Sequence, residues 1–254
     1  MKKVVILCIT YFYLLFSLST LVHAENQAPH VFLDGKLLEF NVSPVIDNGS
    51  TLVPLRKLFE EYGATVSWDE TTSKVTAKYG ETTLIYTIGD LQGFKDNKAI
   101  ALEVPGRIID GSTLIPVRFA SEALGALVGW ENKTRTITIS TKSKRSGTVQ
   151  SVSGNAIEIL PVGEEKPTAE KVHLIGVEPS QLACTNDKLE GKTVNFEHEP
   201  AVADNNSVYG YLYLEDGNML NTQMISEGCE DKSTSSAKYR WAELFEFIKE
   251  TMNK

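Results

Sequence analysis

The chain has 254 residues, of which 42% are hydrophobic and 23% are charged, and its formal net charge is −8. This length and composition suffice for two domains that each bury a core. The acidic charge lies mostly in the second half, since residues 25–146 carry a net charge of −1 and residues 147–254 carry −9. Affinity for a phosphate backbone comes mostly from lysine and arginine, so we do not expect nucleic acid as a partner.

The N-terminus has the pattern of a secretory signal peptide. Two lysines precede an almost wholly apolar stretch over residues 4–22, and a small-residue cleavage site ends at Ala24. The apolar stretch is long for a signal, so an uncleaved anchor is the alternative. We therefore assign residues 1–24 to the signal and expect an extracellular or wall-associated protein without a membrane span after cleavage.

The next part of the chain contains a gapless internal repeat at an offset of 62 residues. Residues 49–56 (GSTLVPLR) return as residues 111–118 (GSTLIPVR), and 13 of 28 positions are identical between 49–76 and 111–138. Self-similarity at a fixed offset indicates one supersecondary unit that is used twice. We predict a repeat domain over residues 27–141.

The first half of the repeat begins with a hairpin and a short strand. Residues 31–40 flank Asp34-Gly35, a dipeptide typical of two-residue hairpin turns. Residues 51–53 predict a short strand, and Pro54 opens a helix because its missing N–H costs nothing in the first turn.

The predicted helix buries one side. Leu55, Leu58, Phe59 and Tyr62 recur at helical spacing and form a single apolar stripe. Gly63 then ends the helix, as glycine commonly does at this position.

Two strands complete the unit, at residues 65–68 and 74–77 around a polar turn. In the second half the same order recurs, with Pro116 opening the helix and Gly125 ending it. The unit is hairpin, strand, helix and hairpin, and two units predict one α+β domain in which sheets pack against helices.

Two arginines occupy equivalent places in the repeat and need partners. Arg56 and Arg118 fall in the first turn of their helices, where a cation opposes the helix dipole. Asp69 and Glu131 occupy matching places after the tryptophans, so we predict the ion pairs Arg56–Asp69 and Arg118–Glu131. Binding of a wall anion is the alternative role for the arginines.

Trp68 and Trp130 also occupy equivalent places. We interpret them as core residues, and a platform for sugars is the alternative. With Pro54 and Pro116 they complete the set of repeat residues to which we assign a structural role.

The repeat resembles the copper amine oxidase N-terminal-like domain, also called the stalk domain. The resemblance rests on the motifs TLVPLR and TLIPVR, each followed at the same spacing by GA, V and W. The resemblance covers about residues 27–141. It implies an α+β fold and an envelope-associated location, because this domain recurs in exported proteins of Gram-positive, spore-forming bacteria. It does not imply copper, since the domain lies away from the metal of the oxidase, and we expect no cofactor.

A polar, basic linker is predicted at residues 142–147, and a second domain at residues 148–254. Its strands and helices suggest a small β-barrel of OB type with C-terminal helices. The predicted strands are residues 148–152, 156–160, 171–177, 193–197 and 208–214, and the predicted helices are 220–227 and about 236–252.

The second domain resembles a distant thermonuclease domain, of the micrococcal nuclease-like (SNase-like) family. The resemblance rests on residues 172–178 (VHLIGVE), 189–194 (LEGKTV) and, most specifically, 211–221 (YLYLEDGNMLN). It implies an OB-type barrel and, in active members, calcium-dependent hydrolysis of phosphodiesters. Those members use two aspartates that hold calcium, a glutamate that activates water, and two arginines.

This chain departs from that catalytic set at nearly every position. The two aspartate positions fall at Asn155 and Glu178, the first arginine at His173, the glutamate at about Gln181, and the second arginine at Ser207 or its neighbour. A dianionic transition state needs a cation and guanidinium donors, and water needs a base. We therefore assign no catalytic residue and interpret the barrel as non-catalytic.

Cysteine and histidine do not indicate a metal site. Cys184 and Cys229 either pair in an oxidising compartment or remain separate thiols, and no CxxC motif occurs. His30, His173 and His198 are widely spaced in the sequence, so we predict no metal site.

The favoured hypothesis is an exported, envelope-associated structural or binding protein with a stalk-like module and a catalytically degenerate nuclease-like module. Its expected partner is a cell-wall or surface component. Two alternatives remain: a secreted calcium-dependent nuclease with an altered active site, in which His173 and Glu178 replace the usual set, and a cell-wall polysaccharide binder. In the last alternative Trp68, Trp130 and the tyrosines of residues 209–213 stack on sugars.

Overall fold

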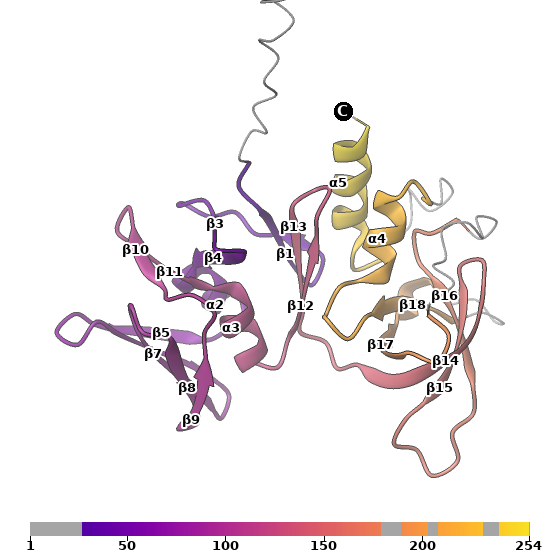
Figure 1. Ribbon diagram of the computed structural model, residues 1–254, viewed down its shortest axis with the longest axis horizontal. Helices are drawn as coiled ribbons and strands as arrows, with labels where there is room; N and C mark the ends of the chain where they lie inside the picture. Colours follow the sequence, from indigo (N-terminus) through magenta and orange to yellow (C-terminus); the bar gives the residue numbers. More distant parts are fainter. Residues whose placement is uncertain (1–26, 179–188, 203–207, 231–238, 254) are drawn as a thin grey trace, which may run out of the picture.

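The computed structural model describes residues 27–178, 189–202, 208–230 and 239–253 (Figure 1). It has mixed secondary structure, with many strands, a few helices and a closed five-stranded barrel in the C-terminal part. In these described ranges, no helix is long and apolar enough to cross a membrane. The predicted signal peptide, Gln181, Cys184 and Ser207 lie outside the described residues.

The repeat domain contains two series of elements in the same order. The first series is β1 (His30–Leu33), β2 (Lys36–Leu37), β3 (Val45–Asp47), β4 (Ser50–Pro54), α2 (Leu55–Glu61), β5 (Thr65–Asp69) and β6 (Lys74–Tyr79), and β7 (Thr82–Thr87) follows it. The second series is β8 (Gln92–Lys95), β9 (Lys98–Ala101), β10 (Arg107–Ile109), β11 (Ser112–Pro116), α3 (Val117–Ala123), β12 (Leu127–Glu131) and β13 (Thr136–Ser140).

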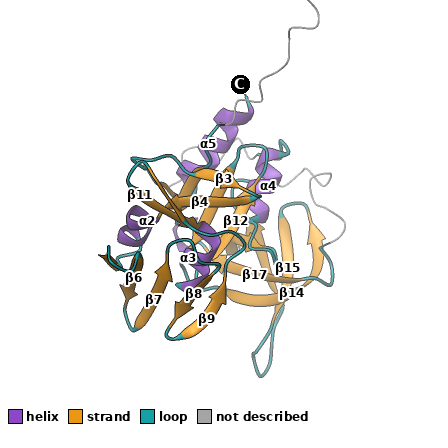
Figure 2. Cartoon of the chain, turned by 60° about the vertical axis from the view of Figure 1, so that its left-hand side comes forward, coloured by secondary structure: helices purple, strands orange, loops and turns teal. Residues whose placement is uncertain are grey.

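The two series meet along their central strands. β4 pairs antiparallel with β11, with Val53 opposite Ile115, inside a four-stranded sheet of order β10-β11-β4-β3. The helices α2 and α3 pack beside this sheet (Figure 2). Each series thus contributes one hairpin and one helix to a common core.

The helices form and end as their sequence predicts. The predicted stripe on α2 is buried along its whole length, and Tyr62, its most exposed member, is 9% exposed. Gly63 and Gly125 follow the two helices with φ of 79° and 84°, a conformation that glycine adopts at little cost. The next amide, Ala64 or Ala126, donates back to the carbonyl of Phe59 or Ser121 at 2.9 and 3.0 Å, which satisfies the helix ends.

One sheet of the repeat domain, of order β12-β13-β1-β2, lies between the two parts of the molecule (Figure 1). Its strand β1 pairs in parallel with β13, which brings residue 30 beside residue 136. Side chains alternate along a strand, so Val31 and Leu33 enter the core of the repeat domain while Phe32 enters the core of the barrel. We call this the shared sheet, because both of its faces are buried.

The second part of the chain forms the barrel and two helices. Its elements are β14 (Arg145–Ser153), β15 (Ala156–Pro161), β16 (Glu170–Leu174), β17 (Thr193–His198), a 3-10 turn (Pro200–Val202), β18 (Val208–Tyr213), α4 (Leu220–Ser226) and α5 (Ala242–Met252). The barrel closes in the order β14-β15-β16-β18-β17, with β16 and β18 parallel.

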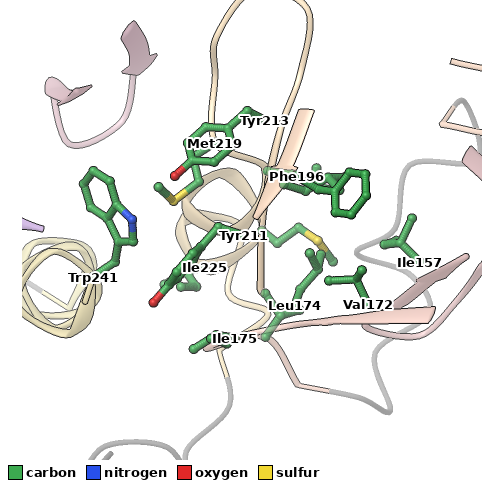
Figure 3. Close-up of a cluster of buried hydrophobic side chains, with 14 of the residues drawn as sticks. Ile157, Val172, Leu174, Ile175, Phe196, Tyr211, Tyr213, Met219, Ile225 and Trp241 are labelled. Carbon is green, nitrogen blue, oxygen red and sulfur yellow. The ribbon is translucent and has the colours of Figure 1, made fainter. Parts of the chain in front are cut away.

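The barrel core extends to the C-terminal helix. Figure 3 shows Trp241, just before α5, pointing toward a cluster that includes Met219 and Tyr211. The Trp241 and Tyr211 rings meet edge to face with their centroids 6.4 Å apart, and both side chains are at most 1% exposed. On the other side of α5, Phe247 packs its ring 5.4 Å from that of Phe32 on the shared sheet.

The predicted linker differs from the structure. The sequence predicts the linker at residues 142–147. Strand β14 begins at Arg145, so residues 145–147 form the first part of a barrel strand. The Lys144 ammonium donates to the carbonyl oxygens of Ser140 and Lys142, at 3.1 and 2.6 Å. The polar composition of this segment reflects exposure beside a strand and does not mark a long free connection.

A turn of the barrel domain docks on the outer edge of the shared sheet. The Trp130 amide donates to the side-chain oxygen of Asn218 at 2.6 Å, and Lys133 forms an ion pair with Glu227 at 2.7 Å. A Cβ placed on Gly129 would lie 2.7 Å from the carbonyl oxygen of Gly217, so only glycine allows this close approach. The two domains therefore form one continuous packed body.

We predict that Gly35→Ala destabilises the protein more than its matched control, Gly49→Ala, because Gly35 contacts the backbone just before α5. Both glycines have positive φ, 90° and 83°, so both substitutions carry the same backbone strain. A Cβ on Gly35 would overlap the backbone oxygen of Arg240, whereas nothing lies within 4 Å of one on Gly49. We expect Gly35→Ala to lower the free energy of unfolding by ~1–3 kcal/mol more than Gly49→Ala in urea titrations. Equal losses would show that this contact does not stabilise the protein.

Candidate functional site

The repeat domain carries two grooves that correspond to each other through the repeat. Groove 1, of about 370 Å³, lies beside Trp68 and is completed by the turn at residues 111–113 of the other series. Groove 2, of about 420 Å³, lies beside Trp130 and is completed by residues 49–51. The offset of 62 residues relates the proline, the arginine, the glutamate and the tryptophan that line each groove, so the repeat builds the same site twice.

Groove 1 combines an apolar wall with charged side chains. Trp68 is 37% exposed and Ile108 is 56% exposed, so part of each apolar surface is open to solvent. Arg56, Lys57 and Glu60 on α2 supply the charges. The prediction that Trp68 is a core residue is therefore wrong, because β5 lies at the edge of its sheet and leaves the indole half-exposed.

The predicted ion pair between Arg56 and Asp69 is wrong. Asp69 accepts hydrogen bonds from the Thr71 amide at 2.9 Å and from the Thr72 hydroxyl and amide at 2.8 and 3.3 Å. The Thr72 hydroxyl bond is the main reason that the pKa of the Asp69 carboxyl is lowered. Arg56 makes no ion pair with any residue that the structure describes.

The predicted ion pair between Arg118 and Glu131 is also wrong, for the same reason. The buried Glu131 carboxylate accepts from the amide and the hydroxyl of Thr134, at 2.6 Å each. Arg118 pairs instead with Glu122, one helical turn later, at 2.9 Å. In both series an acid caps the hairpin turn through a threonine three residues later, and this acid-x-x-Thr spacing can be read directly from the sequence.

The tryptophan of groove 2 is less exposed than that of groove 1. Trp130 is half-buried, and its indole N–H lies 3.4 Å from the side-chain oxygen of Asn132. Beside it, Arg118 reaches both Glu122 and the carbonyl oxygen of Asp216 in the docked turn, the latter at 3.5 Å. The cation of groove 2 is thus already neutralised within the molecule.

In the barrel, the structure places Asn155 beside His173, two of the positions that the resemblance assigns to a nuclease site. Asn155 lies after the first barrel hairpin strand, 5% exposed, and its side-chain N–H donates to the carbonyl oxygen of Val177 at 3.1 Å. Its oxygen lies 3.4 Å from Nδ1 of His173. The His173 ring packs 5.4 Å from that of Tyr209, and Glu178 follows Val177 directly.

The Asn155 amide is neutral and engaged on both sides, so it offers no charge to a calcium ion. No group of three or more histidine, cysteine or acidic side chains among the described residues has the geometry to hold a metal ion. Gln181 and Ser207 lie outside the described residues, and their roles stay predictions.

The buried acids of the barrel serve its structure. Tyr213 donates to Glu197, Tyr211 donates to Glu199 at 2.9 Å, and the Arg240 guanidinium pairs with Glu197. Burial, and then the Glu197 carboxylate, raise the pKa of Tyr213 well above its usual value, so its hydroxyl stays protonated and donating. Tyr211 and Tyr213 lie in the core and do not form a platform for sugars, whereas Tyr209 is partly buried beside His173.

Cys229 is fully buried and disulfide-bonded. The other cysteine of the predicted alternative, Cys184, lies outside the described residues, so its pairing with Cys229 stays a prediction.

Comparison with known proteins identifies one part of the chain. Residues 32–139 match the family model of the copper amine oxidase N-terminal domain. This match covers both series of the repeat domain and includes both grooves. No curated protein matches the chain.

We predict that Asn155→Asp destabilises the barrel in a pH-dependent manner. A carboxylate at this buried position would face the Val177 carbonyl oxygen, so the pKa of the new group would be raised above its value in the unfolded chain. A protonated aspartate can still donate, so the loss should be small near pH 4 and reach about 1–3 kcal/mol as the pH rises to 8.

The measurement is the free energy of unfolding in urea at both pH values. The exposed Asn132→Asp is the matched control, and we expect it to change little at either pH. A pH-independent loss at Asn155 would contradict the hydrogen-bond geometry described above.

Proposed function

We propose that this protein is an exported, envelope-associated structural or binding protein. Its repeat domain acts as a stalk-like module, and its barrel is an OB-type relative of the nuclease domain that does not catalyse hydrolysis. Export is supported by the signal-like pattern of residues 1–24, and the stalk-like role by the family match of residues 32–139.

The observation that carries the non-catalytic assignment is the environment of Asn155. Hydrolysis of a phosphodiester needs a cation site, a base and donors for the developing negative charge. Where the nuclease family places the first aspartate, this chain has a buried amide that is engaged with Val177 and His173. The barrel also carries most of the negative charge of the chain, which repels a phosphate backbone.

The docking of the two domains supports a structural role for the barrel. It contributes Asn218 and Glu227 to the edge of the shared sheet and packs Phe247 against β1. A module that is bound to its neighbour in this way stiffens the stalk and need not perform a reaction of its own.

A second candidate function, binding of a wall polysaccharide, is favoured by Trp68. This side chain is 37% exposed inside a groove, which suits stacking against a sugar ring. The tyrosine strand of the barrel does not support this candidate, because Tyr211 and Tyr213 are 1% exposed.

We predict no calcium-dependent cleavage by this protein. The purified protein is incubated at high concentration with single-stranded DNA and RNA, with and without calcium, beside the double variant His173→Ala/Glu178→Ala. Intact substrates in all reactions are expected, because the charged groups of the nuclease set are replaced. Calcium-dependent cleavage that is lost in the double variant would make the protein a nuclease with a rebuilt site.

The envelope role is tested separately by co-sedimentation with purified cell walls of a Gram-positive bacterium. The protein should sediment with the walls and remain in solution without them. A protein that stays in the supernatant under both conditions would contradict the proposed function.

A further inference from the structure

The two grooves are equivalent in construction but differ in their charge. In groove 2, Arg118 is neutralised by Glu122 at 2.9 Å. In groove 1, the equivalent Arg56 has an equivalent glutamate, Glu60, yet forms no ion pair with any residue in the described ranges. The two grooves can therefore be compared directly: Arg118 has an acidic partner, and the equivalent Arg56 has none among the described residues.

The other cation of groove 1 does not compete for the same ligand. Lys57 binds Glu61 on the same helix at 2.6 Å, and Glu61 also lies 3.5 Å from Lys36. These ion pairs lower the pKa of Glu61, mainly through its hydrogen bond with Lys57. The Arg56 guanidinium is thus the one positive group lining groove 1 that has no acidic partner among the described residues.

The residues that line groove 1 indicate which class of ligand could bind beside Arg56. Trp68 and Ile108 offer exposed apolar surface, continued inward by Val42, Val66 and Val75. Ser112 and Thr113, at the start of β11, also line this groove and carry hydroxyls. A flat apolar face, hydroxyl partners and a guanidinium together match a sugar ring that carries an anionic group, because guanidinium binds carboxylate and phosphate oxygens in a bidentate geometry.

We propose that groove 1 binds an anionic glycan, with a sugar ring stacked on Trp68 and its carboxylate or phosphate bound to Arg56. This inference rests on the proposed envelope-binding function and names the site and the ligand class for it. Its volume of about 370 Å³ lies within the range of small-molecule sites, so it accepts a short stretch of a polymer rather than a folded partner.

Groove 2 does not suit an anionic glycan. Its arginine is neutralised, and Trp130 is half-buried with its amide engaged by Asn218 of the barrel domain. Glu103 and Glu122 also line this groove, so an anion entering it would meet two carboxylates. Groove 2 therefore provides matched controls within the same chain.

The test is isothermal titration calorimetry of the purified full-length protein with three glycans of similar length. Oligogalacturonate carries carboxylates, phosphomannan fragments carry phosphate, and a mannan fragment is neutral. The anionic glycan should bind and the neutral one should not. Whichever anion binds more tightly identifies the source of the negative charge. Failure of both anionic glycans, or equal binding of the neutral glycan, would overturn the proposal.

Variants locate the ligand in groove 1. We expect Arg56→Gln and Trp68→Ala each to weaken binding at least ~10-fold, since each removes one of the two main contacts. Trp68→Phe should retain part of the affinity, and Glu60→Gln should strengthen binding because it removes the negative charge beside Arg56. The control Arg118→Gln, at the equivalent place in groove 2, should leave the affinity unchanged. The thermal midpoint of each variant shows that it is folded.

The outcomes separate this inference from the function on which it rests. Unchanged glycan binding in Arg56→Gln and Trp68→Ala would overturn the assignment of groove 1, even if the protein still sediments with cell walls. Loss of wall sedimentation in the same two variants, with retention in Arg118→Gln, would support both. A wild-type protein that binds no wall would contradict the proposed function.

Discussion

The rest of the structure depends on a sheet that is buried on both faces. Along β1, Val31 and Leu33 belong to the core of the repeat domain, while Phe32 belongs to the core of the barrel. The parallel pairing of β1 with β13 joins the beginning of the repeat domain to its end, and β14 then starts five residues after β13. Because each face of this sheet is the wall of a different hydrophobic core, neither domain can leave the other without exposing apolar surface to water.

The two series of the repeat domain differ where they meet the barrel domain. On the face of β12 that meets the barrel, Leu127 and Gly129 provide apolar surface and close approach, whereas the equivalent positions on β5 are the exposed Thr65 and Ser67. Both series thus contribute to the interface, the first through β1 and the second through β12, and the arginine of the second series contacts the docked turn. The first copy keeps an open groove in which Arg56 is unpaired within the described part of the chain.

Much of this was predictable from the sequence, and the failures have a common cause. Local signals were sufficient for the α2 stripe, the glycines after the helices and the barrel strands, since each depends on spacing within a few residues. The parallel pairing of β1 with β13 joins residues more than a hundred positions apart, and no local pattern reports it. The arginine partners were wrong because Asp69 and Glu131 were matched to distant cations, when their nearest donors were the threonines of their own turns. In the barrel, Asn155 and His173 were singled out only through the resemblance to nucleases, and no local pattern predicts that they are neighbours.

The shared sheet makes the two domains one cooperative unit, and differential scanning calorimetry tests this most directly. A single unfolding transition is expected for the purified protein, with a calorimetric enthalpy equal to the van't Hoff enthalpy. Two separate transitions, one for the repeat domain and one for the barrel, would contradict it. In that case the polar segment before β14 would be a true linker.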